Sequence, residues 1–283
     1  MEMAEMDRGR RLSAVRWLLC GVLIGAGAIL PGVSGGVLAV IFDIYRPFME
    51  LLTSPRKALS KYWRGFIPLS LGWCAGFLGF AKGIAAAISL STAVTTWLFV
   101  GLIAGTLPSL FREAGKEGRP KSAWGSLLLC AGAIFAGLYY VRYMAGVEAE
   151  LDFWWYNFCG VLWGMGIVIP GMTTSSILMA LGLYQPLMEG LAGFKLLALA
   201  SCLPGMLLTM ALLARGVNWL FRRHYAVAFH GILGIVIAST AVIIPTEYAG
   251  AGEALLSALF GLFGVLLAFF LNRLDARSRE REK

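Results

Sequence analysis

The sequence predicts an all-α polytopic membrane protein with two inverted-topology repeats, each a re-entrant, broken helix hairpin followed by three transmembrane helices. Three features lead to this prediction: an apolar composition, apolar runs separated by basic segments, and an internal duplication. Of the 283 residues, 59% are hydrophobic and 14% are charged. Because soluble domains carry about 25% charged residues, this composition excludes a soluble enzyme, a disulfide-rich secreted domain and a disordered chain.

Six apolar runs are long enough to cross a hydrocarbon core of ~30 Å, which takes about 20 helical residues. Two further runs, 15–52 and 153–191, are each interrupted by a Pro-Gly pair. Irregular backbone inside a membrane is tolerated only where protein or a polar cavity surrounds it, so each break favours a re-entrant hairpin. Two full crossings in each run are the alternative. The predicted spans are 65–86, 91–109, 124–144, 194–214, 226–246 and 253–272.

The basic residues are concentrated in segments that would lie on one side of the membrane. The two tails and three of the connections contain 20 of the 24 lysines and arginines. This distribution follows the positive-inside rule and places both termini in the cytoplasm. It also accounts for the net charge of +8, so we expect no nucleic-acid partner. The basic segments are 1–16, 53–64, 110–122, 215–225 and 273–283.

An internal repeat relates the two broken runs. Residues 21–52 align without gaps to 160–191 at an offset of 139, with 12 of 32 positions identical, including both Pro-Gly pairs. Residues 99–105 resemble 229–235 at an offset of 130. Because one hairpin and three spans form each half, the second half would start from the opposite face. The expected units are repeat 1 at 1–144 with hairpin 15–52, repeat 2 at 145–272 with hairpin 153–191, and a basic cytoplasmic tail at 273–283.

Glycine and hydroxyl residues follow each Pro-Gly pair and precede an apolar helix. Such a helix starts with unpaired amides and a positive dipole end, and two of them meeting near the midplane, as in inverted-repeat transporters, would cradle an anion. Self-capping by Ser34 and Thr173 without a ligand is one alternative, and a duplication retained for helix packing is another. The candidate binding residues are Pro31, Gly32, Ser34, Gly35, Gly36, Pro170, Gly171, Thr173, Thr174, Ser175 and Ser176.

Polar residues beyond the breaks are candidates for gating or coupling. Glu50 and Glu189 occupy equivalent positions of the repeat, and ionisable groups beside apolar spans are functional candidates; solvated anchors in the headgroup region are the alternative. His230, within a span, is a candidate proton shuttle or a packing residue. The gating and coupling candidates are Asp43, Tyr45, Arg46, Glu50, Tyr184 and Glu189.

Motifs for covalent chemistry do not occur in the sequence. It contains no Walker loop, no H-E-x-x-H motif, no cluster of metal ligands and no Ser-His-Asp set, and its five cysteines lie in apolar stretches without CxxC spacing. We therefore expect neither a metal nor a cofactor, and a protein that is not an enzyme.

The duplicated motif resembles a known family. A glycine-rich helix, PGVSGG and a tyrosine, with a second Pro-Gly-hydroxyl copy about 140 residues later, are similar to the PopT-type undecaprenyl-phosphate translocase family over essentially the whole chain. The resemblance implies a multi-pass protein of the bacterial inner membrane that returns undecaprenyl phosphate from the outer to the cytoplasmic leaflet for cell-wall (peptidoglycan) synthesis. It also implies that the phosphate headgroup binds at the two breaks, with polyprenyl phosphate and bilayer lipids as partners.

This sequence departs from the family pattern at two places. Thr173 and Thr174 stand where Ser-Gly is expected, and Asp43 replaces a glycine. Proton or sodium coupling through Glu50 or Glu189 is a further hypothesis.

Two other functions use the same pattern. PGVSGG is also similar to the PG-x-S-R-S segment of integral undecaprenyl-pyrophosphate phosphatases, but those enzymes need an arginine after the serine and a Glu-x-x-x-Glu pair. Here Gly35 follows Ser34, and Thr174 follows Thr173. A small-anion carrier with the same helix starts is the second alternative.

Overall fold

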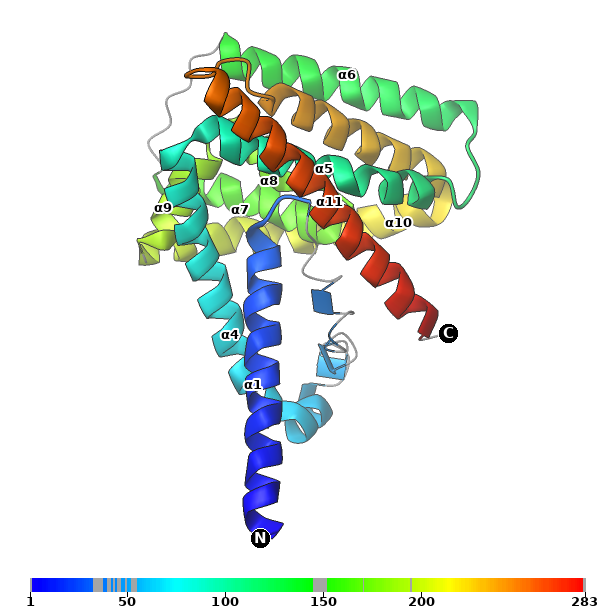
Figure 1. Cartoon of the computed structure of the whole chain (residues 1–283). Helices are drawn as coiled ribbons and strands as arrows, with labels where there is room; N and C mark the ends of the chain where they lie inside the picture. Colours follow the sequence, from blue (N-terminus) through cyan, green and yellow to red (C-terminus); the bar gives the residue numbers. More distant parts are fainter. Residues whose placement is uncertain are drawn as a thin grey trace.

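The computed structural model describes residues 2–32, 38–39, 42, 44, 47–48, 50–51, 55–144, 152–169, 171–193 and 195–281. Within these ranges the chain is helical and contains no strand, which confirms the predicted all-α architecture. The helices (Figure 1) are α1 (Glu2–Ile29), α4 (Pro55–Leu90), α5 (Thr92–Ala114), α6 (Lys121–Tyr143), α7 (Phe153–Val168), α8 (Thr174–Ala180), α9 (Tyr184–Ala192), α10 (Leu196–Ile243) and α11 (Ala251–Arg281).

The long helices have the length and composition of membrane spans. Among the described residues, five helices are long and apolar enough to cross a bilayer, namely α4, α5, α6, α10 and α11. Their outer faces are apolar as well: Leu128 and Leu129 of α6 are 70% and 72% exposed. Large apolar surfaces of this kind face lipid rather than water, so the chain is a multi-pass membrane protein.

Two of the predicted spans, 194–214 and 226–246, fall on the two parts of α10. His224 in its middle has a non-helical backbone (φ −138°, ψ 46°). The rings of Phe221 and Phe229 have centroids 5.3 Å apart, whereas eight residues of a straight helix cover ~12 Å. The helix therefore folds back at His224 into two arms, which Figure 1 shows in yellow and orange.

In its described residues, the second predicted hairpin, 153–191, consists of three helices rather than two equal arms. After α7 come the short helices α8 and α9, separated by a turn in which Gly182 has φ +73°. These two helices supply some of the most buried side chains of the molecule. Leu178, Tyr184, Leu187 and Met188 are each no more than 2% exposed, so the second Pro-Gly break is attached directly to the core.

Helices of the two expected units pack in four pairs. Helix α1 packs against α4, and α7 against the first arm of α10; α5 packs against α11, and α6 against the second arm of α10. Figure 1 shows the α1–α4 pair running side by side, across the direction of α6. The last two pairs each join a helix of the first unit to one of the second.

Glycines at equivalent positions let the helices approach closely in the α1–α4 pair and in the pair of α7 with the first arm of α10. In each contact a Cβ on the glycine would overlap the backbone of the partner helix, so only glycine fits. The contacts of the two pairs are related by a shift of 139 residues in α1 and α7 and of 133 in α4 and α10. In the α1–α4 pair the contacts are Gly21 with Leu69, Gly25 with Trp73, and Gly72 with Leu18. Their equivalents between α7 and α10 are Gly160 with Cys202, Gly164 with Met206, and Gly205 with Asn157.

The shift of 133 extends into the following spans. It relates Ser91, which separates α4 from α5, to His224 at the fold of α10. It also relates Gly101, where α5 approaches α11, to Gly234, where α10 approaches α6. Equivalent helix contacts in these spans are therefore 133 residues apart, whereas the similar sequences 99–105 and 229–235 are 130 residues apart.

Candidate functional site

The first Pro-Gly break follows the end of α1 and presses against α5. Pro31 is buried, and Gly32 has φ +76°, a conformation that favours glycine. A Cβ on Gly32 would lie 2.8 Å from the carbonyl carbon of Leu102 and 2.9 Å from the nitrogen of Ile103. The backbone of the break thus lies directly on the backbone of α5. Ser34, Gly35 and Gly36 lie outside the described residues.

The second break follows the end of α7 and lies near the C-terminal end of α5. Gly171 has φ +81° and is exposed, while Pro170 lies outside the described residues. A Cβ on Gly171 would approach Leu110 Cδ2 at 2.8 Å and Phe229 Cε1 at 3.6 Å. Leu110 is about two turns of helix beyond Leu102, roughly 12 Å along the axis. Both breaks therefore contact α5, one at its middle and one near its end.

Thr173 stands at the N-cap of α8 but does not cap it. Its side chain makes no capping hydrogen bond, and its Oγ1 is buried with no hydrogen-bond partner among the described residues. A buried hydroxyl left unpaired costs about 1–3 kcal/mol. Self-capping, the alternative to a ligand, therefore does not describe Thr173 in this structure.

The other hydroxyl residues of the second break face protein. Ser176 is fully buried; its Oγ lies 3.0 Å from the carbonyl oxygen of Thr173 and 2.8 Å from Oγ of Ser239 in α10. Thr174 is buried against Gly166 of α7, and Ser175 is half-buried. Sequence reasoning missed Ser239, although a Ser-Thr pair in the apolar span 226–246 was a signal that could have identified it.

Tyr184 joins the second hairpin to the end of the first. Its side chain is 2% exposed, and its hydroxyl donates a hydrogen bond of 3.2 Å to the carbonyl oxygen of Ile29, the last residue of α1. The ring of Phe99 in α5 meets the Tyr184 ring edge-on at 5.8 Å. Tyr45, its equivalent in the repeat, lies outside the described residues, as do Asp43 and Arg46.

The two equivalent glutamates have neighbours on the surface. Glu50 forms an ion pair of 3.7 Å with Lys61 of α4, with the two side chains 36% and 62% exposed. Glu189 of α9 is exposed and accepts a hydrogen bond of 2.9 Å from Gln185, one turn earlier. Exposed carboxylates with such neighbours fit the anchor interpretation as well as coupling.

His230 is enclosed between α10 and α6. It is fully buried, with Nδ1 2.7 Å from the carbonyl oxygen of Ala226 and its ring edge-on to Trp124 at 5.5 Å. Its Nε2 has no partner among the described residues. The neighbours of His230 are those of a packing residue, and the ring has no solvent exposure.

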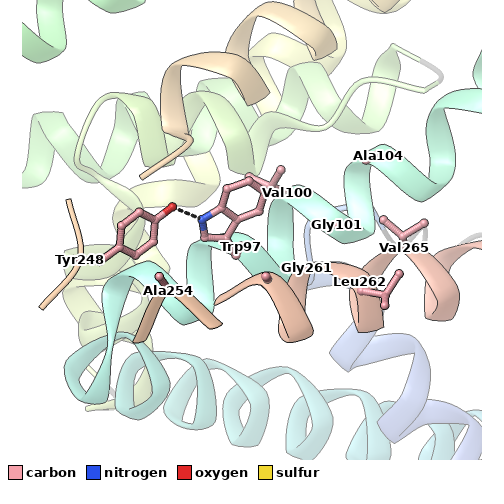
Figure 2. A pocket seen from close by; sticks show the side chains of 10 residues that line it. Trp97, Val100, Gly101, Ala104, Tyr248, Ala254, Gly261, Leu262 and Val265 are labelled. Carbon is pink, nitrogen blue, oxygen red and sulfur yellow. Dashed lines mark hydrogen bonds between the residues drawn. The ribbon is translucent and has the colours of Figure 1, made fainter. Parts of the chain in front are cut away.

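An apolar groove of about 430 Å³ lies between α5 and α11 (Figure 2). Trp97 donates a hydrogen bond of 2.8 Å to the hydroxyl of Tyr248 at one end of the groove. Gly101 and Ala104 line it from α5, roughly opposite Leu102 and Ile103 on that helix, since 3.6 residues make a turn. Its described lining is apolar apart from Trp97 and Tyr248, so it does not suit an anion.

The polar groups described at the second break are hydroxyls and backbone amides. Hydroxyl groups and backbone amides at interrupted helices accept and donate hydrogen bonds and favour anions. In the described part of the chain, no three His, Cys, Asp or Glu side chains are grouped to hold a metal ion. The residues brought together at the second break are thus suited to holding a phosphate or carboxylate.

Comparison with known proteins gives two matches. A family model described as VCA0040-like, undecaprenyl phosphate translocase-like, matches residues 24–258, which include both breaks. A polyprenyl-phosphate transporter of Vibrio cholerae serotype O1 is 25% identical over 254 residues, covering 84% of this chain and 80% of the relative. No solved structure matches. Both descriptions are of transport proteins rather than of enzymes.

Proposed function

The chain belongs to the undecaprenyl phosphate translocase-like family, and we propose that it returns undecaprenyl phosphate from the outer to the cytoplasmic leaflet of the bacterial inner membrane for reuse in cell-wall synthesis. The name of the Vibrio cholerae relative supports a polyprenyl phosphate as the cargo. The structural observation that best supports the proposal is at the second break, where Gly171 is exposed and the buried hydroxyl of Thr173 finds no partner in the part of the chain that the structure describes. An anionic headgroup would supply that partner.

We propose an inverted-repeat architecture, with units at 1–144 and 145–272 that each begin with a re-entrant hairpin. The matching glycine contacts of α1 with α4 and of α7 with α10 support this proposal. So does the equivalence of Ser91 and His224, which interrupt the chain at the same place in each unit. Three spans per unit would invert the second unit relative to the first.

The headgroup would bind between the two breaks. A phosphomonoester carries about −1.5 to −2 charges at pH 7, and transferring such a charge into a medium of low dielectric constant without compensation costs tens of kcal/mol. Hydroxyls and backbone amides of the breaks would replace the lost water. The proposed binding residues are Pro31, Gly32, Ser34, Gly35 and Gly36 in the first break, and Pro170, Gly171, Thr173, Thr174, Ser175 and Ser176 in the second.

The prenyl chain needs no pocket of its own. It is as apolar as the bilayer interior, so it gains little free energy by leaving lipid for protein. We propose that the chain stays in lipid while the headgroup crosses between the breaks. No bond is made or broken in this process, which fits a family of transporters.

The test uses purified protein in liposomes that contain undecaprenyl phosphate. We expect exchange of the headgroup between leaflets, without release of phosphate from undecaprenyl pyrophosphate and without uptake of inorganic phosphate. Phosphate release would identify a phosphatase, and uptake of inorganic phosphate without lipid exchange would identify a small-anion carrier. Either result would overturn the proposal.

A further inference from the structure

A chain of buried hydroxyls links the second break to the second arm of α10. Ser239 and Ser176 are both fully buried, with their Oγ atoms 2.8 Å apart. Ser176 Oγ is 3.0 Å from the carbonyl oxygen of Thr173. The hydroxyl of Thr173 itself is buried and has no partner among the described residues, as is also true of the hydroxyls of Ser201 and Ser257.

Counting protons gives the direction of these bonds. A serine hydroxyl has one proton to donate, and Ser239 Oγ also lies 3.2 Å from the carbonyl oxygen of Val236. That carbonyl already accepts a hydrogen bond of 2.7 Å from the hydroxyl of Thr240. Most acceptors are satisfied when Ser239 donates to Ser176 and Ser176 donates to the Thr173 carbonyl.

In the first unit, Gly32 of the break lies on the equivalent helix, α5, by direct backbone contact. With the shift of 133 residues, Ser239 corresponds to Thr106 and Val236 to Ile103. The Thr106 hydroxyl donates to the Ile103 carbonyl at 2.7 Å, and the Ser239 hydroxyl lies 3.2 Å from the Val236 carbonyl. The backbone of Gly32 lies directly on α5 at Ile103. In the second unit, Gly171 meets only side chains.

We infer that Ser239 is a positioning residue of the proposed headgroup site, acting through Ser176 to hold the Thr173 backbone of the second break against α10. The inference rests on the proposed function, since the headgroup is what the positioned break would bind. Loss of either hydroxyl breaks the link between α10 and the Thr173 carbonyl and lets the break move. Binding of the headgroup weakens, while the helices that surround the break keep their packing.

The test is a double-mutant cycle in the liposome exchange assay with undecaprenyl phosphate. Ser239→Ala and Ser176→Ala should each raise the apparent KM about three- to tenfold, the effect of one neutral hydrogen bond, with the maximal rate unchanged and the protein still folded. The double variant should be no worse than either single variant, because both remove the same link. Ser239→Thr, which keeps a hydroxyl, should restore the affinity.

Thr240→Val is the matched control. Thr240 neighbours Ser239 on α10 and is 9% exposed, but its hydroxyl bonds only one turn back on its own helix. An unchanged KM for Ser239→Ala, or an equal rise for Thr240→Val, would overturn the inference. If Ser239→Ala does not purify, Ser176→Ala and Ser239→Thr provide the same comparison. Absence of exchange by the wild-type protein would instead contradict the proposed function itself.

Discussion

The polar side chains described at the second broken helix are hydroxyl residues, among them Thr173, Ser176 and Tyr184. Of these, the last two are fully or almost fully buried. Burying a lysine or arginine to bind a phosphate would cost several kcal/mol in desolvation before any ligand arrived. Hydroxyls and amides avoid that cost and hold an anion less tightly. Weaker binding of the headgroup suits a transporter, because the cargo has to dissociate after it has crossed the membrane.

The hydroxyl of Tyr184 is predicted to contribute to stability by holding the end of α1. Tyr184→Phe removes only the hydrogen bond to the carbonyl of Ile29. Ile29 is the last residue of α1, where backbone carbonyls have no hydrogen-bond partner within the helix. We expect a loss of about 1–3 kcal/mol, because a buried carbonyl loses a partner. Thermal unfolding in detergent measures it. Tyr140→Phe, at a residue 63% exposed on α6, is the control; equal melting temperatures for both variants would contradict the prediction.

Coupling through the glutamates predicts a change in pH dependence. If a proton moves with the lipid through Glu50 or Glu189, the Gln variant of that residue should exchange undecaprenyl phosphate at a rate independent of pH, while the wild-type rate varies. The measurement is leaflet exchange in liposomes across a range of pH. If both Gln variants keep the wild-type pH dependence, the carboxylates are anchors, as their exposed contacts with Lys61 and Gln185 also allow.

Between helices, glycine decides how closely the broken runs approach their neighbours. Gly21 and Gly25 of α1, and Gly160 and Gly164 of α7, bring backbone against backbone. Such contact lets dispersion and weak Cα–H hydrogen bonds stabilise helix pairs within a membrane, where there is little hydrophobic driving force between helices. The breaks at the ends of α1 and α7 are fixed in space by these pairs.

Gly160→Val is predicted to separate α7 from α10. The added side chain would overlap the Cys202 carbonyl, and overpacking of this kind costs about 1–3 kcal/mol or more. We expect a lower melting temperature and a loss of the monodisperse peak in size-exclusion chromatography. Gly137→Val on α6 is the control, because nothing lies within 4 Å of a Cβ there. A Gly160→Val protein as stable as the control would refute the backbone contact.

Sequence periodicity predicted the elements better than their connections. The six predicted spans fall on five long apolar helices, with two of the spans on α10, and Gly171 of the second Pro-Gly pair follows the end of α7 as expected. The fold-back of α10 lies within the connection 215–225 that separated two predicted spans, but its exact place was not predicted, because His224 and its nearest neighbours include neither glycine nor proline as a turn signal. Ser239 was missed because it is 63 residues from Ser176, and only the packing of α10 against α8 brings the two together.

For the molecule as a whole, the two proposed units are interlocked. Helix α5 of the first packs on α11 of the second, and α6 of the first packs on the second arm of α10. Neither unit therefore completes its own packing. The α1–α4 and α7–α10 pairs stay within their units and carry the breaks, so relative movement of these pairs would change access to a headgroup held between them.

Inverted topology predicts which connections share a side of the membrane. Single cysteines at Glu117 and Glu247, both exposed, would be introduced into a variant without the native cysteines. A membrane-impermeant maleimide added to intact cells should label Glu247→Cys, whereas Glu117→Cys should react only after permeabilisation. Labelling of both from the same side would contradict the proposed topology.

The most direct measurement compares the wild-type protein with the Ser34→Ala/Thr173→Val variant in liposomes containing undecaprenyl phosphate. If the headgroup is held between the two breaks, the wild-type protein exchanges the lipid between leaflets without releasing phosphate. The variant, purified with an unchanged melting temperature, should then be at least about tenfold slower, since it loses a hydrogen-bonding hydroxyl at each break. Exchange by the variant at the wild-type rate would contradict a headgroup site at the breaks.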